Sequence, residues 1–140
     1  MGYDSYVATE REMNGIGGVR DISPTLLFRF RMPGFVPDFD AIEAELGLPP
    51  LRAFLSFSAE DQKKWADAYE YELENSAVAP EVWVEPAEAM VTLRGLLVYM
   101  NAHPEIRGAA DFIEAIQDTA DILQTLQARS VRFHFAIVAP

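Results

Sequence analysis

The segment VRFHFAIV, residues 131–138, decides the predicted fold because its apolar and polar side chains alternate as they do in a β-strand. Successive side chains of an extended chain point to opposite faces of a sheet. Arg132 and His134 would therefore lie on the face opposite to Val131, Phe133, Phe135 and Ile137.

A second segment, LFRFRM at residues 27–32, carries the same pattern far away in the chain. Here Arg29 and Arg31 would lie opposite to Phe28, Phe30 and Met32. Burial of the four phenylalanines in these two segments stabilises a fold by about 6–12 kcal/mol before entropy is subtracted, so we expect them in the core. If both strands belong to one sheet, its other face is basic.

That basic face would oppose the overall composition, which is acidic. The 140 residues contain 22 acidic and 11 basic side chains and carry a net charge of −11. Such a charge repels phosphate backbones, so we expect no nucleic-acid partner, whereas a basic protein would be attracted. The chain has no cysteine, which excludes disulfides, zinc–thiolate sites and thiol nucleophiles and fits a cytoplasmic location.

The N-terminal sequence and the hydropathy pattern show no targeting or membrane segment. The first residues, MGYDS, form neither the basic nor the apolar region of a signal peptide. No run approaches 18 apolar residues, so we expect no membrane span.

Local patterns predict the order of helices and strands. Helix-starting residues such as Ser58 and Pro86, and helix-ending residues such as Gly47 and Pro104, set the boundaries. We expect strands at residues 3–9, 25–32, 81–84 and 131–138, a glycine-rich loop at 14–18, a short helix or turn at 51–57, and helices at 39–46, 58–74, 86–102 and 109–128. The helix at 86–102 has almost no polar side, so we expect neighbours on two of its faces.

This order favours the α+β class. We predict a single two-layer domain over residues 1–140, with a mainly antiparallel sheet of three to five strands and helices packed on one face. The length is sufficient for one hydrophobic core and too short for two.

The predicted basic face, Arg29, Arg31, Arg132 and His134, is the first candidate site. Arginine side chains bind carboxylates or phosphates, so this face could hold an anionic ligand. The same cations could instead pair with acids such as Asp4 or Glu81, or the face could form a homodimer interface. Trp83 would add an aromatic anchor if it points away from the core.

A row of carboxylates on the helix at 109–128 is the second candidate. Its members follow one another at helical spacing: Asp111, Glu114, Asp118 and Asp121. The row could be a solvated surface or a docking face for a basic partner. Carboxylates at helical spacing diverge, and no two histidines have the spacing of a zinc motif, so we expect no metal and no cofactor.

These features favour a non-enzymatic protein–protein interaction module whose acidic surface binds a basic partner. In composition, though in no motif, the chain is similar to toxin-neutralising immunity proteins, which are small, acidic bacterial-type domains. No nucleophile motif is present, and we assign no catalytic residue. The alternative is a small ligand-binding domain or enzyme that acts on an anionic small molecule through the basic face.

Overall fold

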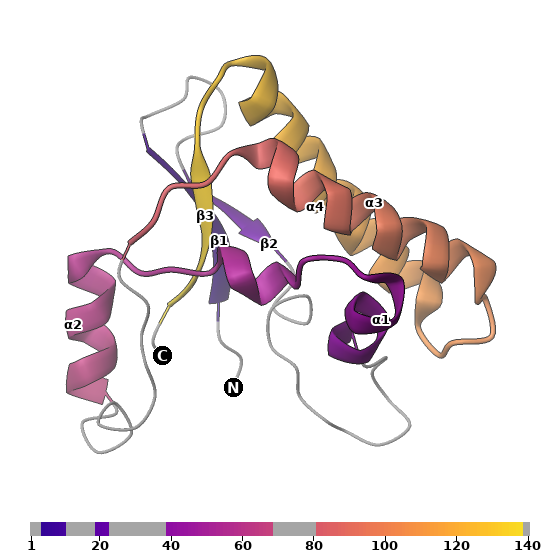
Figure 1. Cartoon of the computed structure of the whole chain (residues 1–140). Coiled ribbons are helices and arrows are strands. Elements are labelled where there is room, and N and C mark those ends of the chain that lie inside the picture. Colours follow the sequence, from indigo (N-terminus) through magenta and orange to yellow (C-terminus); the bar gives the residue numbers. More distant parts are fainter. Residues whose placement is uncertain (1–3, 11–18, 23–38, 69–80, 139–140) are drawn as a thin grey trace.

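The computed structural model describes residues 4–10, 19–22, 39–68 and 81–138. Two long helices lie side by side on one side of a small group of strands, and a shorter helix lies on the other side (Figure 1). In chain order the elements are β1 (Asp4–Thr9), β2 (Val19–Ile22), α1 (Phe39–Leu46), the 3-10 helix η2 (Leu51–Phe54), α2 (Ala59–Ala68), α3 (Pro86–Ala102), α4 (Ala109–Ala128) and β3 (Phe133–Val138).

The helical hairpin of α3 and α4 is the largest unit of the described fold. The two helices have 17 and 20 residues, whereas the strands have four to six. Pro86 occupies the first turn of α3, where its fixed φ angle suits a helix and its missing N–H costs nothing. The turn between the helices contains Gly108 at φ 79°, a conformation that favours glycine.

The strands form a small antiparallel arrangement in the order β2-β1-β3. Its main part is the pair β1–β3, which runs in register from Asp4 opposite Val138 to Thr9 opposite Phe133. Strand β2 adds four residues on the other side of β1. The outer edge of β3 is covered, because Ser56 donates to the carbonyl of Phe135 and Val84 exchanges two backbone hydrogen bonds with Phe133.

The hydrophobic core lies between the helical hairpin and one face of the β1–β3 pair. Val7 lies opposite Phe135 in the register, and both are buried together with Phe133. The residues of the two long helices that complete this cluster are also buried: Ala89, Met90, Leu93, Leu96, Met100, Ala109, Ile116, Leu123 and Leu126. Phe133 and Phe135 therefore point into the core, as their alternation predicts.

The predicted fold class is wrong. We expected a two-layer domain based on a sheet of three to five strands, but the described part is mostly helical, and its sheet is little more than one antiparallel pair. Helices also do not form a layer on one face, because α2 and the α3–α4 hairpin flank the strands from different sides (Figure 1). The helices are long enough to bury apolar surface against each other, so they need no broad sheet to pack on.

One further prediction differs from the structure. The strand expected at 81–84 is reduced to a single bridge between Val84 and Phe133. Helix α3 has neighbours on two sides, as predicted, since it packs against α4 and against the segment from α1 to η2, while Val91 and Val98 are 53% and 71% exposed. The strand expected at 25–32 and the glycine-rich loop at 14–18 lie outside the described residues, and strand β2 was not expected.

Most predicted helix boundaries are confirmed. Helices α1, α3 and α4 have the predicted limits, and η2 lies within 51–57. Ser58 caps α2, since its hydroxyl oxygen accepts a hydrogen bond of 3.1 Å from the backbone N–H of Asp61. Capping and helix termination depend on residues close in sequence, which explains why local patterns located them.

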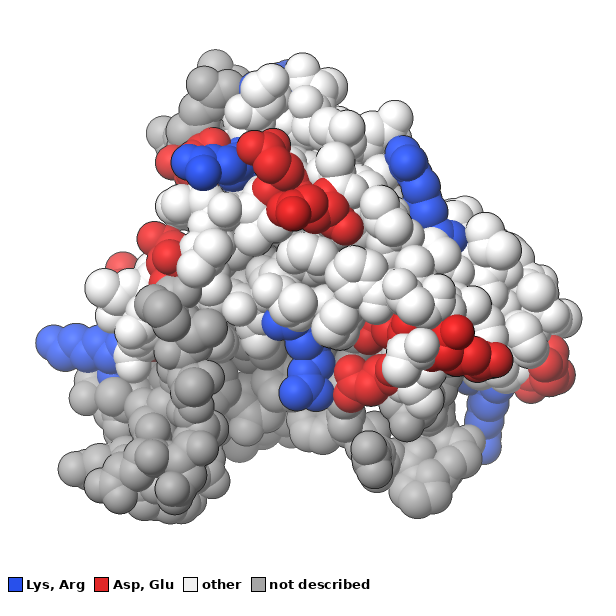
Figure 2. Space-filling view, in the orientation of Figure 1, with Lys and Arg blue, Asp and Glu red and all other residues white. Residues whose placement is uncertain are grey.

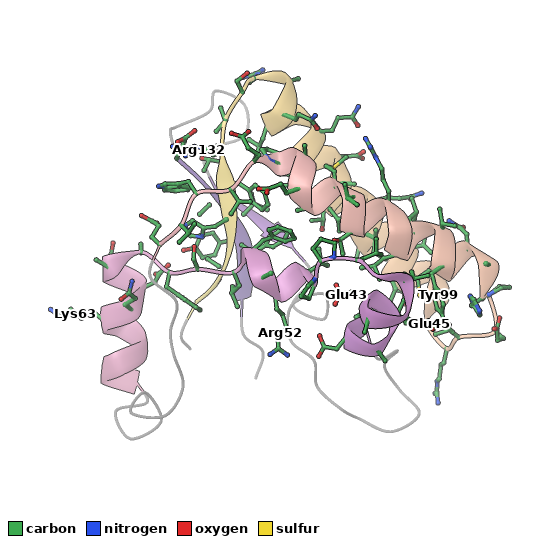
Figure 3. The ribbon with its side chains drawn as sticks, in the orientation of Figure 1. Glu43, Glu45, Arg52, Lys63, Tyr99 and Arg132 are labelled. Atoms are coloured by element: carbon green, nitrogen blue, oxygen red, sulfur yellow. The ribbon has the colours of Figure 1, made fainter. Side chains whose placement is uncertain are left out.

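The turn between α1 and η2 packs on α3. Gly47 adopts φ 68° after the last residue of α1. A side-chain carbon added at Gly95 would collide with the Cδ1 atom of Leu48, so the glycine in α3 provides space for this leucine. The carboxylate of Glu43 is buried and accepts a hydrogen bond of 2.9 Å from the backbone N–H of Leu51 (Glu43 is labelled in Figure 3).

Candidate functional site

The second face of the β1–β3 pair is the region where the sequence predicts a basic surface. Of the four predicted cations, Arg132 and His134 lie in the described part of the chain, and Arg29 and Arg31 lie outside it. His134 lies opposite Ala8 on β3, and Arg132 directly precedes the strand. Both are paired with carboxylates, although in very different surroundings.

Arg132 is exposed and forms a clamp with Glu10 at the end of β1. Its Nε and Nη2 atoms donate to Oε2 of Glu10 at 3.0 and 2.9 Å, and its backbone N–H donates to Oε1 at 3.0 Å. The backbone N–H of Glu10 in turn donates to the carbonyl of Arg132 at 3.1 Å. These contacts join the ends of two neighbouring strands and raise the pKa of the guanidinium, chiefly through the hydrogen bond to Glu10.

His134 is almost completely buried, with an exposed fraction of 1%. Its Nε2 atom lies 2.9 Å from Oε2 of Glu81, and its Nδ1 atom lies 3.0 Å from the carbonyl oxygen of Phe135. One ring nitrogen therefore faces a carboxylate and the other faces a backbone carbonyl oxygen, so both polar atoms of the buried ring have a protein partner.

The indole of Trp83 packs against the same imidazole in a tilted orientation. The two ring centroids are 4.7 Å apart, with an angle of 45° between the ring planes. Glu81 and Trp83 are two residues apart in an extended segment, so both side chains project to the same side and meet His134. Trp83 is half-buried and keeps part of its surface toward solvent.

Tyr6 completes this face from strand β1. Its hydroxyl donates a hydrogen bond to Oδ2 of Asp61 on α2, which connects that helix to the strands. The pKa of Tyr6 is raised well above its ordinary value, first by burial and then by the hydrogen bond and the negative charges of Asp61, Glu81 and Glu60.

The surface of this region is consequently acidic. The two described cations of the predicted basic face are both paired with carboxylates, and His134 lies beneath Glu81 and Trp83. Between Arg132 and Lys63, which are labelled in Figure 3, Figure 2 shows carboxylates and no other basic side chain of the described residues in this view. In its described part, this face is suited to a cation.

The imidazole of His134 is not available as a general base. General-base catalysis needs a nitrogen or carboxylate within reach of a substrate proton, but both ring nitrogens of His134 contact protein oxygens and the ring is buried. Within the described ranges, no group of three or more acidic, histidine or cysteine side chains has the geometry of a metal site.

The predicted acidic row lies along the solvent-facing side of α4. The side chains of Asp111, Glu114, Asp118 and Asp121 are exposed, whereas Ile116, Leu123 and Leu126 of the same helix are buried. In the part of the chain that the structure describes, none of these four carboxylates takes part in an ion pair. We call these four residues the α4 acidic row.

Sequence reasoning named Glu81 as a pairing partner but missed Glu10, Asp61 and Tyr6. Glu10 and Arg132 are 122 positions apart, and Tyr6 and Asp61 are 55 apart. The alternation in β1 placed Tyr6 opposite to Val7, and this was the one available signal. No sequence pattern connects it to a particular residue of α2.

Comparison of the chain with known protein families, curated proteins and solved structures finds no match. Among the residues that the structure describes, no helix combines the length and apolar character needed to cross a membrane.

Proposed function

We propose that this chain is a non-enzymatic protein-binding module, located in the cytoplasm, whose α4 acidic row docks a basic partner. The observation that carries the proposal is the exposure of four carboxylates, without an ion pair among the described residues, along one side of a helix whose other side is anchored in the core. A rigid helix presents these charges at fixed spacing, and a net charge of −11 adds long-range attraction for a basic protein.

The alternative, a site for an anionic small molecule on a basic sheet face, has less support. Arg132 is engaged by Glu10, and His134 is buried beneath Glu81. An anion at this position would have to displace these carboxylates and would meet repulsion from their charge. An acidic module of the immunity or inhibitor kind, which we propose, binds a basic partner, and these carboxylates would not repel such a partner.

A charge-matched pair of variants tests the proposal. Glu114→Gln and Asp121→Asn together remove two charges from the α4 acidic row. Glu45→Gln and Glu105→Gln remove two exposed charges elsewhere, so both variants retain the same net charge. Asp111 is left in place because it lies in the first turn of α4, where its charge stabilises the helix.

Binding of a fluorescently labelled hexalysine peptide is measured by anisotropy over a series of salt concentrations. We expect the α4 variant to bind at least about fivefold more weakly than the control variant at low salt, with the difference shrinking as salt rises. Circular dichroism checks that both variants are folded. Equal loss of binding in both variants would show that net charge alone attracts the peptide and would refute a specific role of α4.

A further inference from the structure

Two side chains that contact His134 each have a polar atom without a partner among the residues that the structure describes. Glu81 uses Oε2 to contact His134, and in the described part of the chain its Oε1 atom receives no hydrogen bond. The indole N–H of Trp83 likewise has no acceptor among the described residues. Two partly exposed side chains that contact the same imidazole therefore each have an open polar atom, an acceptor on Glu81 and a donor on Trp83.

Contacts with the buried imidazole of His134 hold the side chains of Trp83 and Glu81 in position. The Trp83 ring rests on the buried imidazole at a centroid distance of 4.7 Å, and the Glu81 carboxylate is held 2.9 Å from its Nε2 atom. The backbone of the segment is also held, since Val84 pairs with Phe133 and the hydroxyl of Ser56 bonds both backbone groups of Val82. Groups that are ordered before binding lose less entropy when a ligand arrives.

The charge around this spot is negative. Glu81, Asp61 and Glu60 all act on Tyr6, and Glu85 follows Trp83 by two positions. The described cation that lies next to β3 in sequence, Arg132, is bound by Glu10. A positively charged group would therefore meet attraction from several carboxylates and the face of an aromatic ring.

We propose that Trp83 and Glu81 form a binding subsite for an arginine side chain of a partner protein. The guanidinium lies over the exposed part of the Trp83 ring and donates to Oε1 of Glu81, and the indole N–H donates to a carbonyl of the same partner. The basic nature of the partner rests on the proposed function, but the subsite is separate from the α4 acidic row.

Arginine suits this subsite better than lysine does. Its guanidinium is flat, stacks on an indole and still directs N–H groups toward a carboxylate at the ring edge. A lysine ammonium is a compact and strongly hydrated charge, so it gains less from the ring. The subsite therefore predicts a preference between two peptides of equal charge.

The test uses the ¹⁵N-labelled full chain and three peptides: hexaarginine, hexalysine and hexacitrulline, the last being an uncharged isostere of hexaarginine. The chain has two tryptophans, so the indole N–H signal of Trp83 is assigned in the NMR spectrum by its loss in Trp83→Phe. We expect hexaarginine to shift this signal in a saturable manner and to bind about three- to tenfold more tightly than hexalysine. Hexacitrulline should leave it unchanged.

Glu81→Gln should weaken hexaarginine binding by about threefold or more, whereas Glu105→Gln, an equal change of charge at an exposed position, should alter it by less than about twofold. An unmoved Trp83 signal, or equal losses in the two variants, would refute the subsite. If Glu81→Gln does not fold, the shift of the Trp83 signal in the wild-type titration with hexaarginine decides whether the subsite exists. The α4 variant separates the two proposals, since a normal Trp83 shift in that variant retains the subsite even if the acidic row proves irrelevant.

Discussion

His134 on β3 and Glu81 before α3 form a pair in which Nε2 and Oε2 are 2.9 Å apart, and this pair joins the last strand to the segment that covers its edge. The imidazole is buried, while the carboxylate is partly open to solvent. A polar residue that alternation would assign to a sheet surface is thus covered by Glu81 and Trp83 of one segment and lies opposite Ala8 of β1.

The first prediction concerns this pair. Glu81→Ala leaves Nε2 of a buried ring without a partner, so we expect the free energy of unfolding to fall by about 1–3 kcal/mol. Urea denaturation monitored by circular dichroism measures this loss. Glu85→Ala is the control, because it removes an exposed carboxylate that makes no contact with His134, and it should change stability by less than about 0.5 kcal/mol. Similar values for the two variants would contradict a stabilising role of the pair.

A second prediction follows from the raised pKa of Tyr6. In the unfolded chain tyrosine ionises at about pH 10, whereas the folded protein keeps the Tyr6 proton to higher pH. The contribution of this group is therefore complete below about pH 10 and is lost as pH rises above that value. Wild-type stability should decline above pH 10 more steeply than that of Tyr6→Phe, by up to about 1.4 kcal/mol per pH unit.

Urea denaturation between pH 8 and pH 11 measures the two slopes, and absorbance at 295 nm follows tyrosine ionisation directly. Tyr99→Phe provides the control, since it removes a tyrosine from α3 and leaves the contact between Tyr6 and Asp61 unchanged. If the free energies of unfolding of the wild type and Tyr6→Phe changed in parallel with pH, the result would contradict the raised pKa of Tyr6.

The third prediction concerns the contact between Gly95 and Leu48. Alanine in place of a helical glycine stabilises a helix by about 1 kcal/mol, but here the new methyl group collides with Leu48. We expect Gly95→Ala to be nearly neutral in the wild type and to stabilise the Leu48→Ala variant by about 1 kcal/mol. A double-mutant cycle of unfolding free energies measures the difference. The same effect in both backgrounds would show that the two residues are not coupled.

The fourth prediction concerns the buried carboxylate of Glu43. Glu43→Ala removes the acceptor for the N–H of Leu51 at the start of η2, so we expect a loss of about 1–3 kcal/mol. Glu45→Ala removes an exposed carboxylate from the same helix and should cost less than about 0.5 kcal/mol. Thermal and urea unfolding of both variants provide the comparison, and equal stabilities would refute the role of Glu43.

The boundaries of α1, α3 and α4 and the direction of Phe133 and Phe135 could be predicted because they depend on neighbours in sequence. Caps, helix-ending glycines and alternating side chains act over a few residues. The fold class could not be predicted in this way. Whether a helix packs on a sheet or on another helix depends on which apolar faces contact each other. Local sequence patterns identify the apolar face of each element, but they do not show which two faces pack together.

The candidate site, like the fold, could be predicted from the sequence only in part. The sequence alone determined that β3 has one face for the core, that α4 carries a row of carboxylates, and that the chain is strongly acidic. The tertiary structure decided the sign of the charge on the second face of the strands. It brings Glu10 to Arg132 and Glu81 to His134 although the two pairs are 122 and 53 positions apart in sequence. Which carboxylate pairs with Arg132 or His134 depends on tertiary packing, which local sequence patterns do not specify.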